Sequence, residues 1–140
     1  MSTFDIKIEG RGMWFMIHTL ALHANTDELK GAFILTINTL YENFGCESCK
    51  PHFRKFLDDY PIKNYWHIKY KGEDYGFFKW SWDFHNDVNK RLKKPILSFE
   101  DALFRYKNYV CKNCDKKINN PILVEVKEKE PYTLNLLSNY

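Results

Sequence analysis

Apolar residues recur at helical spacing along most of this chain. From Arg11 to about Ala24, the side chains of Trp14, Ile17 and Leu20 fall on one face of a helix. The same spacing predicts further helices: Thr26 or Asp27 to about Phe44, Cys46 to about Asp59, about Tyr75 to Lys93, and Ser98 to about Tyr109. The pattern therefore predicts an all-α helical bundle followed by an irregular C-terminal tail.

Residues that favour turns or caps mark the ends of these helices. Gly45 follows the second helix, and Pro95 ends the fourth. Ser98 and Asp101 have the spacing of a capping box, with Asp in place of the usual Glu or Gln. Residues 62–75 lack the helical period, and both a short strand with a turn and a long loop fit them.

A chain of 140 residues supports one domain with a core of its own. We expect residues 1–9 to form a leader and residues 10–109 the domain. Residues 110–140 then form a C-terminal segment that carries a second C-x-x-C pair.

The charge and the hydropathy of the chain exclude some classes of partner. A net charge of +3 is too small to indicate a nucleic-acid partner. No apolar run approaches transmembrane length, and the first ten residues lack the apolar core of a signal peptide. We therefore expect a soluble protein of the cytoplasm. Stable structural disulfides are rare there, so paired cysteines indicate catalysis or metal binding.

Two compositional features fit either packing or ligand binding. Aromatic residues make up 17% of the chain, which suits a dense core and equally a site for a planar ligand. A basic run lies near the end of the fourth helix, at Lys90, Arg91, Lys93 and Lys94. Cations stabilise a helix C-terminus, but the run directly follows an H-N-x-V-N segment, and this position favours a phosphate site.

The first C-x-x-C pair, Cys46 and Cys49, lies at the start of a predicted helix. A helix N-terminus stabilises a thiolate, and thiolates carry out disulfide exchange. The alternative is half of a tetrathiolate zinc site, completed by Cys111 and Cys114. Several helices separate the two pairs, so the redox interpretation is the stronger. A thioredoxin-like pair would need a βαβ scaffold, which the helical pattern does not supply.

Two predicted helices carry polar and aromatic residues on one face. Trp14 and His18 are four positions apart, as are His85 and Asn89. An indole stacks on a planar ring, while imidazole and amide groups hydrogen-bond to the edge of a heterocycle. A histidine alone is more often a core residue, but together with the cysteine pair these residues indicate a cofactor contact.

Three motifs in order resemble those of the Erv/ALR-type FAD-linked sulfhydryl oxidases. Gly10 to Thr19 is similar to the family's G-R-x-x-W-x-x-x-H-T helix. Cys46 to Arg54 resembles its C-x-x-C-x-x-x-F-R active-site helix. Trp80 to Pro95 is similar to its H-N-x-V-N-x-x-L-x-K-P signature. The resemblance covers about residues 10–109.

The resemblance implies a four-helix bundle with a short fifth helix that holds FAD. It implies that Cys49 is the sulfur next to the flavin and Cys46 the interchange sulfur. The residues that it places on FAD are Arg11, Trp14, His18, His85, Asn86, Val88, Asn89 and Lys94. Tyr106 occupies an aromatic position on the fifth helix. The resemblance also implies that reduced protein thiols or a thioredoxin-like carrier supply electrons, that O2 accepts them to give H2O2, and that the chain forms a homodimer.

The chain also departs from the family pattern. Residues 62–75 lengthen the segment between Cys49 and His85, and the structural cysteine pair of the cellular members is missing. A compact chain of this kind resembles the versions of large cytoplasmic DNA viruses, which would place it in the host cytoplasm or the virion.

Alternatives to the flavoenzyme remain at this point. One is a zinc-stabilised helical interaction module that uses both C-x-x-C pairs, and another is a disulfide carrier without flavin. The second pair, Cys111 and Cys114, fits a shuttle disulfide, a structural disulfide or a metal knuckle. A shuttle predicts that Cys114→Ser slows the turnover of a protein substrate much more than that of a small dithiol.

Overall fold

The structure is a computed structural model and describes residues 5–109. The chain divides into two units, residues 1–108 and residues 109–140, and the first is described by itself. Its elements are α1 (Ile6–His23), α2 (Asp27–Glu42), α3 (Lys50–Asp59), the 3-10 helix η1 (Ile62–Tyr65), β1 (Lys69–Tyr70), β2 (Glu73–Asp74), α4 (Gly76–Arg91) and α5 (Phe99–Lys107). The predicted all-α fold is confirmed, with a two-stranded hairpin as its β-structure within the described residues.

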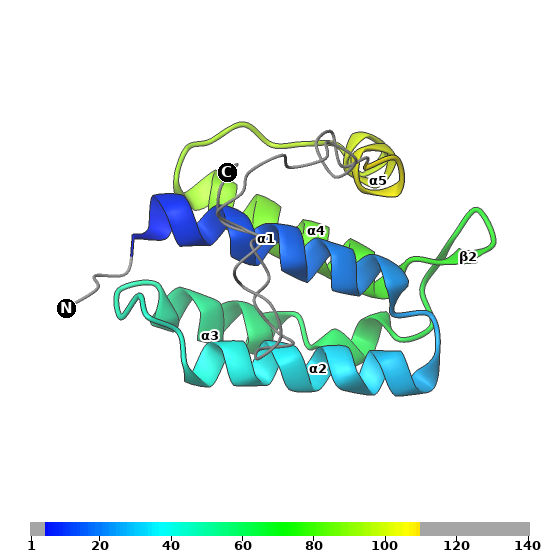
Figure 1. The fold of residues 1–140 in the computed structure, drawn as a ribbon, viewed down its shortest axis with the longest axis horizontal. Helices are drawn as coiled ribbons and strands as arrows, with labels where there is room; N and C mark the ends of the chain where they lie inside the picture. Colours follow the sequence, from blue (N-terminus) through cyan, green and yellow to red (C-terminus); the bar gives the residue numbers. More distant parts are fainter. Residues whose placement is uncertain (1–4, 110–140) are drawn as a thin grey trace, which may run out of the picture. The chain divides into compact units, whose positions relative to one another are not determined.

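The helices α1 to α4 form the bundle, and α5 crosses it (Figure 1). Helix α1 packs against α4, α2 and α5, while α3 packs against α2. The start of α1, the α2–α3 connection and the end of α4 lie at the same end of the bundle, on the left of Figure 1. The β-hairpin projects from the opposite end.

Side-chain caps fix the starts of three helices. Thr26 accepts a hydrogen bond from the Leu29 amide, and Ser98 accepts one from the Asp101 amide, as the cap signals predict. Asp5 accepts one from the Lys7 amide, so α1 begins at Ile6 and not at Arg11. Residues 6–9 of the predicted leader are therefore helical, and Asp5 is the cap signal that marks this start.

The third helix differs from its prediction. It begins at Lys50, and Cys49 is its N-cap residue. Cys46 lies in the turn before it, where its carbonyl oxygen accepts hydrogen bonds from the amides of Cys49 and Lys50, with N–O distances of 3.0 and 3.1 Å. Pro51 at the first turn favours a helix start after the cysteine pair, because its fixed φ suits that position.

Residues 62–75 form η1 and the hairpin, which confirms the strand-and-turn alternative. The two turn residues, Lys71 and Gly72, have φ values of 53° and 83°, and a tight two-residue turn requires such left-handed backbone. The hairpin is tied to α2 by the ammonium of Lys30, which lies 2.6 Å from the carboxylate of Asp74 and donates a 2.7 Å hydrogen bond to the Trp66 carbonyl oxygen.

Two apolar clusters fill the interior. The larger lies between α1, α2, α3, η1 and α4, and its fully buried members include Ile37, Phe77 and Trp80. The smaller joins α1 and α4 to α5 through Leu22, Phe78 and Leu103. Together the clusters pack α1, the helix that carries Trp14 and His18, against α4. Among the described residues, no helix has both the length and the apolar character needed to cross a membrane.

Candidate functional site

The first and third motifs meet where α1 packs against α4. The rings of Trp14 and His85 are stacked, with centroids 4.0 Å apart and planes inclined by 4°. One turn further along α1, His18 lies beside Ser81, which is one turn earlier on α4. The two helices therefore run antiparallel, and residues before Trp14 and after His85 approach the same end of the bundle.

His18, His85 and Ser81 form a hydrogen-bonded chain in the interior. His18 Nδ1 lies 2.9 Å from Ser81 Oγ, and His18 Nε2 lies 2.8 Å from His85 Nδ1. His18 is only 2% exposed. Burial, with a contribution from His85, lowers the pKa of His18 from 6.5 to about 3. Burial, assisted by Lys94 and Arg105, lowers the pKa of His85 from 6.5 to about 4. Both rings are therefore neutral at pH 7.

The cysteines of the second motif are joined in a disulfide. Cys46 and Cys49 are both half-buried, with Cα atoms 5.2 Å apart. Gly45, Glu47 and Ser48 around them are exposed. Because Cys49 caps α3, its sulfur lies where the helix dipole favours negative charge once the bond is reduced.

A run of aromatic contacts connects α3, the helix that follows this disulfide, to the rings on α1 and α4. Phe53, one turn after Cys49, packs against Phe84 with ring centroids 4.8 Å apart. Phe84 in turn meets the indole of Trp14 edge-on at 5.0 Å. The three sequence motifs thus belong to one contiguous cluster.

Tyr106 of α5 lies over the inner histidine. Its ring centroid is 4.8 Å from that of His18 and 6.2 Å from that of Phe15. Burial raises the pKa of the Tyr106 hydroxyl, against an opposing effect of Arg105. The expected position of Tyr106 on the fifth helix therefore brings it next to the site.

Asn86 lies apart from this cluster. Its carboxamide donates to the carbonyl oxygen of Leu97 at 3.0 Å and accepts from the Leu97 amide at 3.4 Å. The side chain thus binds the connection between α4 and α5. Val88 packs against the larger core cluster, and Asn89 is half-buried. The cofactor roles of all three stay predictions.

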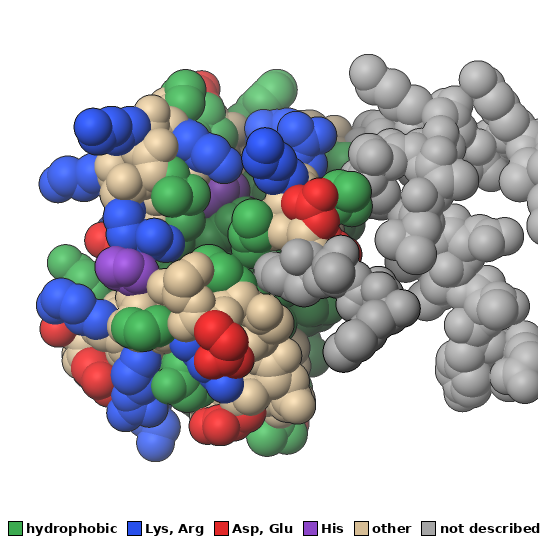
Figure 2. Space-filling view, turned by 90° about the vertical axis from the view of Figure 1, so that its left-hand side faces the viewer, with side chains coloured by type: hydrophobic (Ala, Val, Ile, Leu, Met, Phe, Trp, Pro, Cys, Tyr) green, Lys and Arg blue, Asp and Glu red, His purple; other side chains and the backbone are tan. Residues whose placement is uncertain are grey.

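The end of the bundle nearest this cluster is basic. Arg11 lies about one turn before Trp14, and Lys94 lies just beyond the end of α4, and both are exposed. Figure 2 looks onto this end, where lysine and arginine side chains are spread over much of the face among apolar ones. The arrangement suits an anionic group bound beside an aromatic surface.

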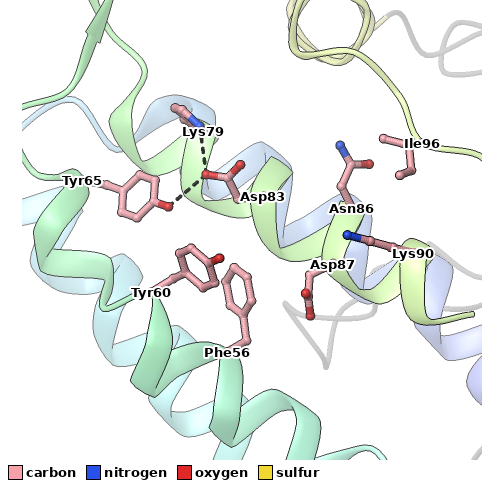
Figure 3. A pocket seen from close by; sticks show the side chains of 9 residues that line it. All are labelled: Phe56, Tyr60, Tyr65, Lys79, Asp83, Asn86, Asp87, Lys90 and Ile96. Carbon is pink, nitrogen blue, oxygen red and sulfur yellow. Dashed lines mark hydrogen bonds and ion pairs between the residues drawn. The ribbon is translucent and has the colours of Figure 1, made fainter.

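A separate pocket of about 460 Å³ opens where α4 faces the end of α3 and η1 (Figure 3). It is lined by Phe56, Tyr60, Tyr65, Lys79, Asp83, Asn86, Asp87, Lys90 and Ile96. Asp83 already accepts hydrogen bonds from Tyr65 and Lys79 at 2.9 Å each. Of the residues that the family resemblance places on FAD it includes Asn86 alone, together with Lys90 of the basic run, so the pocket is distinct from the cluster around Trp14 and His85.

Several residues of the cluster were not predicted as site residues, although Phe53 belongs to the C-x-x-C-x-x-x-F-R motif. Ser81, Phe84 and Phe53 supply the cluster's innermost hydrogen bond and its aromatic link to α3. Phe84 and Phe53 carried an apolar signal of the core but nothing that specified a partner. Ser81 carried a signal of another kind, since a serine amid the aromatic residues of α4 breaks the apolar pattern.

The second cysteine pair, Cys111 and Cys114, lies outside the described residues. Within residues 5–109, no group of three or more His, Cys, Asp or Glu side chains is placed to hold a metal ion. The sulfurs of Cys46 and Cys49 are bonded to each other. A zinc site with all four cysteines would need this bond to be reduced.

The chain is thus an all-α disulfide protein with a stacked indole and imidazole between two of its helices. The model of the Erv1 / Alr family matches residues 11–107, and the chain belongs to this family. The resemblance seen in the sequence motifs is thereby confirmed.

Relatives of the chain come from plants, fungi and a virus. The chain is 26% identical to "FAD-linked sulfhydryl oxidase ERV1" of Oryza sativa subsp. japonica, over 81% of this chain and 58% of the relative. It is 29% identical to "Mitochondrial FAD-linked sulfhydryl oxidase ERV1" of Saccharomyces cerevisiae, over 65% of this chain and 46% of the relative. The match thus spans less than two thirds of these relatives.

The viral relative is of similar size. "FAD-linked sulfhydryl oxidase" of African swine fever virus is 28% identical, over 76% of this chain and 86% of the relative. Among solved structures, "Crystal structure of yeast Erv1 core" superposes with a TM-score of 0.63 at 23% identity, covering 79% of this chain and 91% of the other. This likeness supports the fold.

Proposed function

We propose that this chain is an FAD-dependent thiol oxidase in which Cys46–Cys49 is the redox disulfide. The observation that carries the proposal is the run of ring contacts from Phe53, whose amide donates to the Cys49 carbonyl oxygen, through Phe84 to Trp14. It connects the helix that follows the disulfide to an aromatic and histidine cluster in a chain of the Erv1 / Alr family, whose relatives are named FAD-linked sulfhydryl oxidases.

The residues at this end of the bundle fit FAD. The indole of Trp14 offers a surface for a planar ring, and the neutral imidazole of His85 offers a hydrogen-bonding edge. Arg11 and Lys94 provide positive charge for a pyrophosphate. When bound, FAD supplies the two-electron acceptor that passes the electron pair on to O2 and yields H2O2.

The chain's own part in the reaction is a disulfide exchange. A thiolate of a reduced dithiol substrate attacks Cys46, whose neighbours Gly45 and Glu47 are exposed, and displaces Cys49 as a thiolate. The second substrate thiol then attacks the mixed disulfide and releases Cys46. The substrate loses two electrons and two protons and gains one S–S bond. The N-terminus of α3 stabilises the thiolate of Cys49.

The substrate and the assembly belong to the proposal as well. Reduced protein thiols or a thioredoxin-like carrier supply the electrons, and the chain acts as a homodimer. In this scheme Cys111 and Cys114 shuttle electrons to Cys46. Comparison of Cys114→Ser on a protein substrate and on dithiothreitol tests this last role.

The test combines the visible spectrum with oxygen consumption. We expect the purified chain to bind FAD and to consume O2 with dithiothreitol. Cys49→Ser and Cys46→Ser should keep FAD bound while oxygen consumption falls by at least a hundredfold. Glu47→Gln, which changes an exposed residue between the cysteines, is the control and should stay within about twofold of the unaltered chain. A folded chain that takes up no FAD, or a Cys49→Ser variant of normal activity, would contradict the proposal.

A further inference from the structure

Ser81 is a fully buried hydroxyl that the proposed reaction does not use. Its Oγ lies 2.7 Å from the backbone carbonyl oxygen of Phe78 and 2.9 Å from His18 Nδ1. A carbonyl oxygen only accepts hydrogen bonds, and a serine hydroxyl has one proton. The proton of Ser81 therefore points to Phe78, and the oxygen of Ser81 accepts from His18.

This direction fixes the proton on the first histidine. His18 must carry its proton on Nδ1 in order to donate to Ser81. The ring is 2% exposed and, being neutral, has one N–H, so Nε2 carries a lone pair. His18 Nε2 then accepts the 2.8 Å hydrogen bond from His85 Nδ1.

The same logic passes to the second histidine. Because Nδ1 of His85 holds the proton that it donates to His18, the neutral ring carries a lone pair on Nε2. His85 is half-buried and stacked on Trp14, so this nitrogen belongs to the ring that borders the proposed cofactor site.

We propose that Ser81 is a positioning residue that anchors a one-way hydrogen-bond chain, Ser81–His18–His85, and thereby sets His85 Nε2 as an acceptor. The ligand group that this nitrogen takes is a hydrogen-bond donor, a hydroxyl or N–H of a flavin nucleotide. The choice of ligand rests on the proposed function, whereas the assignment of the proton to Nδ1 in both histidines rests on the hydrogen bonds themselves.

The proton positions are measurable by long-range ¹H–¹⁵N NMR of the full chain labelled at histidine, at pH 7. We expect His18 and His85 both to be neutral with the proton on Nδ1. Addition of FAD should shift the resonance of His85 Nε2 in the direction of an accepted hydrogen bond. The proposed hydrogen-bond chain is overturned if either ring is neutral with its proton on Nε2 or is found as an imidazolium.

Ser81→Ala tests the role of the anchor. With the hydroxyl removed, we expect His18 to populate both neutral forms and the FAD dissociation constant to rise about tenfold, the loss that corresponds to one hydrogen bond. The matched control is Thr36→Ala, which deletes a hydroxyl that donates to the Ala32 carbonyl oxygen on α2. It should leave the histidine spectra and FAD binding unchanged.

The outcomes separate this inference from the proposed function. Nδ1 protons that persist in Ser81→Ala, with unchanged FAD affinity, overturn the role of Ser81. If the unaltered chain binds no FAD, the proposed function and the donor ligand fail, while the spectrum of the flavin-free chain still decides the order of protons.

Discussion

The indole of Trp14 lies parallel to the imidazole of His85, with ring centroids 4.0 Å apart. The contact joins two motifs that are far apart in the sequence, and it covers one face of His85. The edge-on contact with Phe84 continues from the same indole towards the disulfide. The geometry of the site therefore depends on Trp14.

Replacement of this indole tests that dependence. Trp14→Ala should lower the free energy of unfolding by about 2–4 kcal/mol, since it removes a large packed ring and its contacts with the rings of His18, Phe84 and His85. It should also weaken FAD binding more than tenfold. Trp66→Ala is the control, because Trp66 packs on Phe77 and bonds to Asp27 at the start of α2. It should cost stability and keep FAD affinity. Equal FAD affinities in the two variants would contradict the assignment of Trp14 to the site.

The buried histidines predict a loss of stability in mild acid. The pKa of His18 is about 3 and that of His85 about 4 in the folded chain, whereas the ordinary value is 6.5. At a pH between 6.5 and these lowered pKa values, the unfolded chain therefore binds more protons than the folded chain. The contribution of these histidines to the free energy of unfolding is therefore fully present above pH 6.5, and it is lost as the pH falls towards 4. Between pH 6.5 and pH 5 the loss should be on the order of 1–2 kcal/mol per histidine.

Urea unfolding at a series of pH values measures this slope. His18→Asn removes the most buried titrating ring and should flatten the profile between pH 6.5 and pH 5. His23→Asn removes an exposed histidine at the end of α1 and serves as the control. A profile that keeps its full slope in His18→Asn would show that other groups dominate.

The ion pair between Lys30 and Asp74 should hold the hairpin on α2. The side chain of Lys30 is 6% exposed and that of Asp74 is 24% exposed, with their charged atoms 2.6 Å apart. Oδ1 of Asp74 is buried and already lacks a hydrogen-bond partner. Lys30→Met strands this carboxylate, and it should cost about 2–4 kcal/mol of unfolding free energy.

A double variant separates the charge from the packing. Lys30→Met combined with Asp74→Leu removes both charges, so we expect it to be more stable than Lys30→Met alone. Urea denaturation of the single and double variants gives the coupling. A double variant at or below the stability of Lys30→Met would rule out an uncompensated charge as the cause.

Gly76 is required by a close backbone approach. A Cβ atom at this position would lie 1.9 Å from the carbonyl oxygen of Tyr65, so α4 or η1 must shift to admit a side chain. Gly76→Ala should therefore lower stability by about 2–4 kcal/mol. At Gly31, in α2, nothing lies within 4 Å of such an atom. Gly31→Ala should instead raise stability by about 0.5–1 kcal/mol. Thermal and urea unfolding of the pair checks both signs.

The sequence determined most of the helices and the chemistry of the motifs. Apolar spacing predicted α2, α4 and α5 to within a few residues, and Thr26 and Ser98 marked the starts of two of them. These features are local, because a helical period and a cap depend on neighbours a few positions away. For the same reason the apolar spacing missed the first turn of α1, where Ile6 and Ile8 are 46% and 64% exposed and carry no core pattern.

The tertiary structure alone decided which side chains meet. Packing of α1 against α4 brought Trp14 onto His85 and His18 onto Ser81, while Asn86, the direct neighbour of His85, turned to the Leu97 backbone. A sequence gives each residue its face of a helix, but not the register between two helices. That register is set by the fit of side chains across the core. It also places Ser81, His18 and His85 within hydrogen-bonding distance and so sets the direction in which each of them donates.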